Sequence, residues 1–215
     1  MPLNPSALPS GVPPSAGPWL IPRHSRIAIN LPWPYCLIHE HEKFIGMWGD
    51  KMLEFIKPGK PRAMVWSSDA DIDIDGPGGS KATDKYWQPE TSLRWPDRSS
   101  VDSRAFPGIV VPPPVEKEFG VRIGDYGAII WAGQLCYAQV YDVGPTAKIG
   151  ELSIFLGRQC GLVTPEQSDY HAATKGNSAT DLFYLIFPGS GPGHAVENDQ
   201  ILREARTRLG QLEGA

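Results

Sequence analysis

Alternating apolar and polar positions predict that most of this chain folds into short strands. Apolar runs separated by turn-forming residues occur at 63–66, 109–112, 126–131, 135–141, 152–156 and 182–187. Ala132 and Gly133 separate two of these runs, so we expect residues 126–141 to form one antiparallel hairpin. The 22 prolines and 23 glycines of the chain also favour strands and loops over long helices. The pattern therefore predicts a mainly β, barrel-like fold of antiparallel strands with few short helices.

One clear helix is expected near the C-terminus, at Asn198–Leu212. Ile201, Ala205, Leu209 and Leu212 recur every three or four positions, and charged residues occupy the other face. Such a helix packs on the body of the protein or on a partner. Two other segments keep two alternatives open. Residues 151–160 suit either a strand or a helix, and residues 51–56 suit either a short strand or one or two helical turns.

The same patterns divide the chain into three parts. Residues 1–61 form a proline-rich N-terminal arm and packing segment, residues 62–191 a catalytic domain, and residues 192–215 a C-terminal helical tail. Residues 1–34 contain nine prolines and no basic stretch followed by an apolar one, so no secretory signal is visible. We expect a cytoplasmic protein or one exported by a non-classical route. No apolar run approaches the ~18 residues that span a bilayer, so no membrane span is expected.

Composition excludes several classes of function. The formal net charge of −4 and the lack of a basic stripe argue against nucleic acid as a partner. Cysteine and histidine show no zinc-ligand spacing, and neither a phosphate-binding loop nor a serine nucleophile elbow is present. We expect no cofactor and no metal ion. The three cysteines include no CxxC pair, so we interpret them as reduced thiols, with Cys136 a small core residue.

Two carboxylates, Asp142 and Glu151, carry the most informative chemical pattern. Each lies at the end of an apolar run, and a glycine- and proline-containing loop connects them. Two carboxyl groups about 6.5–9.5 Å apart leave room for the water molecule that an inverting glycosidase activates. The alternative interpretation is a hairpin that carries two solvated acids.

A row of aspartates precedes Gly76, at positions 69, 71, 73 and 75. Isoleucines alternate with them, which predicts a strand with its acids on one face. The row could present carboxylates to a cleft, belong to a solvated strand, or bind an ion. A calcium loop of the EF-hand type counted from Asp71 requires a glutamate at its twelfth position, where this chain has Ala82.

Five segments in a fixed order resemble the glycoside hydrolase family 75 chitosanases. They are DADIDIDG at 69–76, PETSLR at 89–94, GVRIGDYGAIIWAGQLCYAQVYDVGP at 120–145, KIGELSI at 148–154 and TDLFYLIFPGSG at 180–191. The chain departs from the secreted fungal members at Ile74, where they have cysteine. The resemblance implies an inverting endo-chitosanase that cleaves β-1,4-linked glucosamine polymer, with Asp142 and Glu151 as its catalytic acids.

The resemblance also suggests how substrate is bound. It implies that Asp73 and Asp75 help to form the cleft and that Thr91 and Ser92 make polar contacts with substrate. Trp87 and Trp95 lie among polar loop residues and are candidates to stack on sugar rings. Lys148 is expected to keep one catalytic acid ionised.

We expect Asp142 to act as general acid and Glu151 as general base. Two other functions remain open: hydrolysis of a different amino-sugar wall polymer such as peptidoglycan, and a non-catalytic carbohydrate-binding or scaffold domain. Protein partners cannot be read from the sequence.

Overall fold

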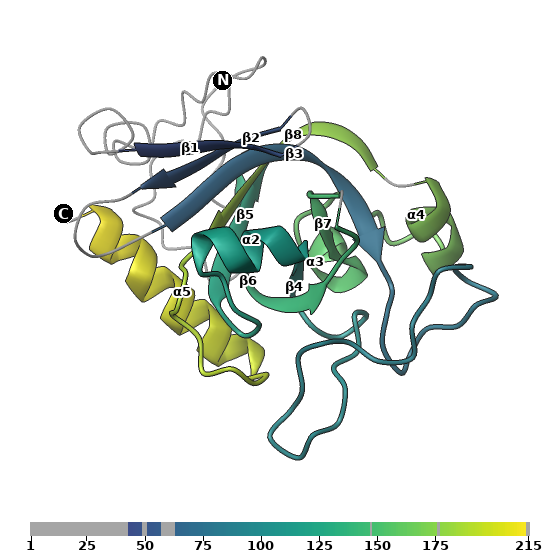
Figure 1. The fold of residues 1–215 in the computed structure, drawn as a ribbon. Coiled ribbons are helices and arrows are strands. Elements are labelled where there is room, and N and C mark those ends of the chain that lie inside the picture. The colour runs from purple at the N-terminus through teal and green to yellow at the C-terminus, as the bar shows by residue number, and fades with distance from the viewer. Residues whose placement is uncertain (1–42, 49–50, 57–62, 147, 176, 214–215) are drawn as a thin grey trace.

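The computed structural model describes residues 43–48, 51–56, 63–146, 148–175 and 177–213. The strands of the described chain belong to one curved sheet that closes on itself, with helices around it (Figure 1). The strands are β1 (Lys43–Trp48), β2 (Lys51–Ile56), β3 (Ala63–Asp73), β4 (Gly108–Val111), β5 (Tyr126–Trp131), β6 (Gln134–Val143), β7 (Glu151–Ser153) and β8 (Asn177–Ile186). The helices that concern us are α2 (Pro113–Phe119), α3 (Ile154–Gln159), α4 (Asp169–Lys175) and α5 (Asn198–Glu213).

Six of the strands form a closed barrel in the order β3-β7-β4-β6-β5-β8, and β8 pairs back onto β3. Strands β1 and β2 extend the sheet from β3 as an antiparallel pair. Most pairings in the barrel are antiparallel, as expected. Two are parallel, β3 with β7 and β4 with β6. The pairings of β4 with β6 and with β7 bring together strands that are not adjacent in the sequence.

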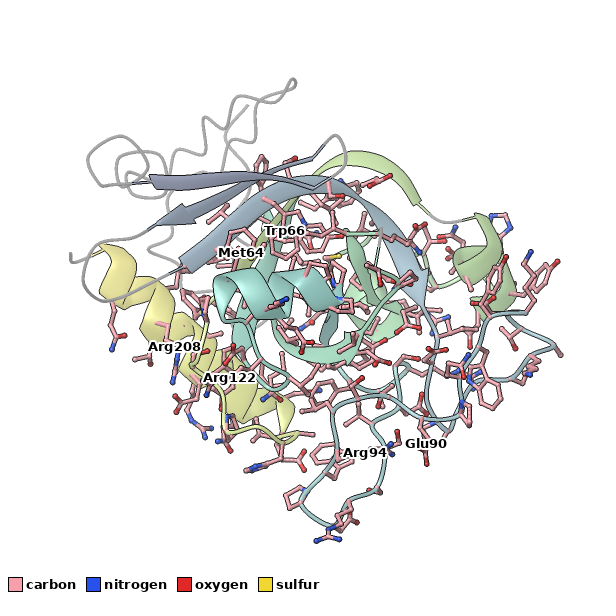
Figure 2. The ribbon with its side chains drawn as sticks, viewed as in Figure 1. Met64, Trp66, Glu90, Arg94, Arg122 and Arg208 are labelled. Carbon is pink, nitrogen blue, oxygen red and sulfur yellow. The ribbon has the colours of Figure 1, made fainter. Side chains whose placement is uncertain are left out.

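The barrel interior is apolar. One buried cluster contains side chains from all six barrel strands. The strands of a closed barrel all face the interior on one side, so this cluster fills the interior. Met64 and Trp66 belong to it and point inward from β3 (Figure 2). The Trp66 ring stacks on Tyr184 of β8 with centroids 4.8 Å apart. Helices α2 and α3 add side chains to the same cluster, so the core continues beyond the barrel strands.

A second buried cluster lies on the outer face of β5 and β6, beneath α5. Ile201, Ala205 and Leu209 of α5 are buried there. These are three of the four positions whose spacing predicted this helix. The helix is therefore part of the packed body in the described structure. Arg208 lies over the Tyr126 ring at 4.8 Å from its centroid and also pairs with Glu204.

The strands and the C-terminal helix expected from the sequence are confirmed. The hairpin turn lies at Ala132 and Gly133, which both have positive φ, as a type I′ hairpin turn requires. Residues 51–56 form a strand. Residues 151–160 contain both alternatives, because β7 passes directly into α3 at Ser153, whose side chain accepts a hydrogen bond from the Leu156 N–H. Two short helices, α2 and α4, were not predicted.

Residues 1–42 lie outside the described residues, so the proposed N-terminal arm stays a prediction. Among the helices that can be described, none has the length and apolarity to cross a membrane.

Asp125 fixes the loop after β8 to the start of β5. Its buried carboxylate accepts hydrogen bonds from the backbone N–H groups of Arg122, Gly189 and Gly191 at 2.7, 2.9 and 3.0 Å. We expect Asp125→Ala to lower the free energy of unfolding by at least about 2 kcal/mol, because it leaves these donors without their acceptor. Urea denaturation measures the change. Asp97→Ala is the matched control, since Asp97 accepts similar bonds from Ser99 in an exposed loop. Equal losses in the two variants would contradict this role.

Candidate functional site

Strand pairing places Asp142 and Glu151 at the same level of the barrel, on a row of paired residues across neighbouring strands that we call the rung. Val110 of β4 is the register partner of both, with Glu151 on β7 and Asp142 on β6. Asp71 of β3 continues the rung, because it pairs with Glu151. Two strand spacings separate the backbones of Asp142 and Glu151, which is about 9.5 Å.

A register shift in β6 determines which way Asp142 points. Ile109 pairs with Val140, but Val110 pairs with Asp142, so Tyr141 is an extra residue. Such a bulge redirects side chains and is frequent beside active sites. Without it, Asp142 would lie on the inner face with Val140. Gly108 is needed here because any side chain at this position would overlap the Tyr141 ring.

The rung opens to a cavity of about 1100 Å³, slightly larger than the ~300–1,000 Å³ of typical small-molecule sites. Its walls come from the ends of β3, β4, β6 and β7, from the connection after β3, and from α4. Acidic side chains lining it outnumber lysines by six to three: Asp71, Asp73, Asp75, Asp84, Asp142 and Glu151 against Lys81, Lys85 and Lys148.

Asp142 is buried and tied to the connection between β3 and β4. Its Oδ1 accepts hydrogen bonds from the Ser92 N–H at 3.0 Å, from the Ser92 hydroxyl, and from the Val143 N–H at 2.7 Å. Leu93 anchors this segment, because its N–H donates to the Tyr141 carbonyl at 2.8 Å. Burial raises the pKa of Asp142, and the bonds from Ser92 and Val143 oppose that rise.

Glu151 lies beside the amine of Lys148. Their charged atoms are 3.4 Å apart, and Lys148 also contacts Asp71 at 3.0 Å. Burial raises the pKa of Glu151; Lys148 lowers it, and Asp71 and Asp142 add to the rise. A Cβ added to Gly144, two residues after Asp142, would lie 3.1 Å from Oε2 of Glu151. The loop that follows Asp142 therefore passes directly by the Glu151 carboxyl group.

Two further aspartates, Asp73 and Asp75, lie close to Asp142. We call these three aspartates the acidic floor of the cavity. The carboxyl group of Asp73 accepts hydrogen bonds from the Tyr141 hydroxyl and from the Asp75 N–H, and Asp75 accepts one from the Gln88 N–H at 2.7 Å. Burial raises the pKa of Asp73 well above its usual range, with Asp75 and Glu151 adding to the effect. Burial also raises the pKa of Asp75 to about 7, and Asp142 and Glu151 contribute.

The three aspartates of this floor are also where a cation could bind. Carboxylate oxygens of Asp73, Asp75 and Asp142 lie within 4.8 Å of one another, and oxygen ligands suit calcium or magnesium. Each group already has protein partners, namely Tyr141, Gln88 and Ser92. The floor has the ligand type for a hard metal ion, and the same oxygens suit a protonated amine.

The predicted site residues divide into two groups. Asp73, Asp75, Asp142, Lys148 and Glu151 all line the cavity. Ser92 contacts Asp142 directly, which gives this residue a positioning role that the sequence did not indicate.

The other three predicted residues lie elsewhere. Thr91 is buried and holds the connection after β3 through bonds to the Leu93 and Val101 carbonyls. Trp87 packs against the interior cluster and donates its indole N–H to the Gly76 carbonyl at 3.0 Å. Trp95 packs edge-on against Phe106. None of the three is among the residues that line the cavity in the described structure.

Several residues that line or support the site were not selected from the sequence. Tyr141 was interpreted only as a strand residue, although its hydroxyl binds Asp73. Asp71 and Asp84 also line the cavity, as do two exposed tyrosines, Tyr86 and Tyr170. A tyrosine in a polar loop or a short helix produces no periodic pattern, so only the structure indicates these positions.

Comparison of the sequence with models of known protein families and with curated proteins finds no match.

The raised pKa of Asp75 makes stability depend on pH. Its pKa rises from 3.8 to about 7 on folding, so between these values the folded state binds more protons than the unfolded state. Protonation of Asp75 therefore stabilises the folded state fully below about pH 4, and this stabilisation is lost as pH rises through about 7. Asp75→Asn removes this dependence. We expect the Tm of the variant relative to wild type to be higher at about pH 8 than at about pH 4, measured by circular dichroism.

Asp97→Asn is the matched control, because hydrogen bonds from Ser99 lower the pKa of Asp97. It should show no gain at high pH. A Tm difference for Asp75→Asn that stays constant across this range would contradict the account.

Proposed function

We propose that this protein is an inverting endo-glycoside hydrolase that cleaves β-1,4-linked glucosamine polymer. The observation that carries the proposal is the pairing of Asp142 and Glu151 through Val110, on one rung facing one cavity. With backbones about 9.5 Å apart, the two side chains can reach the 6.5–9.5 Å carboxyl separation of inverting enzymes. The resemblance to family 75 chitosanases favours the same pair.

The hydrogen bonds favour the opposite division of roles from the one expected from the sequence. Three donors converge on Oδ1 of Asp142, and hydrogen bonds to a carboxylate favour its ionised form. Asp142 is therefore the better general base, which activates water. Glu151 is the better general acid, which protonates the leaving oxygen, because burial has the largest effect on its pKa and favours the protonated form, as do Asp71 and Asp142, against the opposing effect of the Lys148 amine. The number of donors on each carboxylate could not be read from the sequence.

The charge of the cavity supports a cationic sugar as substrate. Acids outnumber lysines on its walls, and like-charge repulsion contributes to the raised pKa values of Asp73 and Asp75. A protonated amine would offset both the burial and the repulsion. Glucosamine units carry such an amine, whereas N-acetylated units do not.

Incubation of the purified protein with soluble chitosan tests the activity. The proposal predicts an early loss of viscosity together with new reducing ends, as internal cleavage produces. Turbidity loss on purified peptidoglycan sacculi without cleavage of chitosan would assign the protein to the other amino-sugar wall polymer. Cleavage of neither polymer would leave a non-catalytic carbohydrate-binding domain as the better interpretation.

Substitution of the two acids tests their roles. We expect Glu151→Gln and Asp142→Asn each to lower kcat on chitosan by at least ~10²-fold, the scale of lost general acid or base catalysis, with little change in Tm. Only Glu151→Gln should recover on a dinitrophenyl glycoside of a glucosamine oligomer, because this leaving group needs no proton. More than a tenth of wild-type activity in either variant would remove that residue from the mechanism. Recovery of Asp142→Asn instead would reverse the two roles.

Asp73 and Asp75 provide a test of charge recognition. If they bind protonated amines, Asp73→Asn and Asp75→Asn should raise KM for glucosamine oligomers, most strongly at low salt. Binding of N-acetylated oligomers should hardly change. Asp97→Asn is the matched control, because Asp97 lies in an exposed loop and is not among the residues that line the cavity. Equal weakening toward both kinds of oligomer would contradict recognition of the amine. A chelator that lowers the Tm of wild type but of neither variant would indicate a metal instead.

A further inference from the structure

We infer that Tyr86 and Tyr170 form an aromatic subsite that stacks against a pyranose ring of the bound polymer at the cavity wall. The inference rests on the proposed function in taking a saccharide as the ligand. The observation that supports the inference does not involve the acids. Within the described part of the chain, Tyr86 and Tyr170 are the large hydrophobic side chains left exposed, at 73% and 58%. Both line the cavity that contains Asp142 and Glu151.

The backbone on both sides of Tyr86 is fixed. Asp84 accepts hydrogen bonds on its side chain from the Tyr86 N–H at 2.9 Å and on its carbonyl from the Trp87 N–H at 3.1 Å. The Trp87 indole is anchored to the Gly76 carbonyl at 3.0 Å. Trp87 is thus the anchor of this loop, and its neighbour Tyr86 is exposed on the cavity wall.

The backbone of Tyr170 is fixed as well. Asp169, which precedes it in the first turn of α4, forms ion pairs with Arg104 at 2.9 Å and Arg158 at 2.7 Å. Ala172 of the same helix is buried in the interior cluster. Helix α4 is therefore fixed by the ion pairs of Asp169 and by the buried Ala172, and the Tyr170 side chain is exposed on this fixed helix.

These two positions suit stacking on sugar. A tyrosine has two side-chain torsions, so an exposed ring on an anchored backbone loses little entropy on binding. A β-linked pyranose presents an apolar face of C–H groups, which aromatic rings cover, while the acidic floor binds its polar groups. The Lys85 amine lies 4.5 Å from the Tyr86 ring centroid, a contact that shows the face of this ring to be accessible to another group.

Stacking and charge recognition make different predictions. Contact with ring C–H groups does not require the amine to be charged, so the tyrosines should contribute equally to binding of glucosamine and N-acetylglucosamine oligomers. Asp73 and Asp75 should act on the charged oligomer alone. The two contributions can therefore be separated by the choice of oligomer.

Calorimetric titration of the Glu151→Gln variant with hexamers of glucosamine and of N-acetylglucosamine tests the inference without turnover. In this background Tyr86→Ala and Tyr170→Ala should each raise the Kd for both hexamers about tenfold, the scale of one aromatic contact. Tyr86→Phe and Tyr170→Phe should retain the affinity of the parent. His171→Ala is the matched control, because His171 is exposed on α4 and is not among the residues lining the cavity.

Unchanged Kd values in the alanine variants would overturn the aromatic subsite, and so would a parent variant that binds neither hexamer. Loss of affinity for the glucosamine hexamer alone would also contradict it, since stacking does not depend on the amine. The proposed activity is judged separately by wild-type cleavage of chitosan. Tyrosine-dependent binding by a protein that cuts no polymer would support the subsite and reject the activity, and cleavage with unchanged Kd values would do the reverse.

Discussion

The pairing of β4 with both β6 and β7 is the constraint on which the site depends. Asp142 and Glu151 have Val110 as a common register partner, so the barrel itself sets the spacing of the two acids. The bulge at Tyr141 then moves Asp142 from the apolar inner face to the cavity face. The Tyr141 hydroxyl at the same bulge donates a hydrogen bond to Asp73, so this part of β6 contacts a second acid of the cavity.

Burial of several carboxyl groups in one cavity has an energetic consequence. Removal from water raises the pKa of Asp73, Asp75, Asp142 and Glu151, and each charge makes ionisation of the next less favourable. Lys148 lies on the side of Glu151 and Asp71, and Ser92 binds Asp142. The neutral donors thus favour the ionised form of Asp142, whereas burial and the neighbouring acids favour the protonated form of Glu151 against the opposing effect of Lys148. General acid–base chemistry requires this division between neighbouring carboxyl groups.

Much of this architecture could be predicted from the sequence, because local pattern encodes it. Period-two alternation indicated the strands, and the spacing of Ile201, Ala205 and Leu209 indicated α5. The closing of the barrel was expected, but its two parallel pairings were not, since register between distant strands leaves no local pattern. Helix α2 follows the strand expected at 109–112 and was missed, although proline is favoured in the first turn of a helix.

The candidate site was predictable where charge stood out from its surroundings. Asp142 and Glu151 border apolar runs, the resemblance to family 75 chitosanases singled out Asp73 and Asp75, and all four line the cavity. Aromatic residues could not be assigned in the same way. Trp87 and Trp95 have polar neighbours in the sequence but pack against the two core clusters, because the connection after β3 folds back over the barrel. The smaller Tyr86 beside Trp87 is the residue left exposed.

The central claim is that Asp142 and Glu151 act from opposite sides of one sugar with a water molecule between them. Proton NMR of the first product released from a glucosamine hexamer tests this most directly, because the anomeric signal reports stereochemistry before mutarotation. The account predicts that cleavage of the β-linkage first gives the α-anomer, and that no product signal forms with Glu151→Gln. Initial release of the β-anomer would mean retention of configuration, and with it a different arrangement of acids from the one described for this cavity.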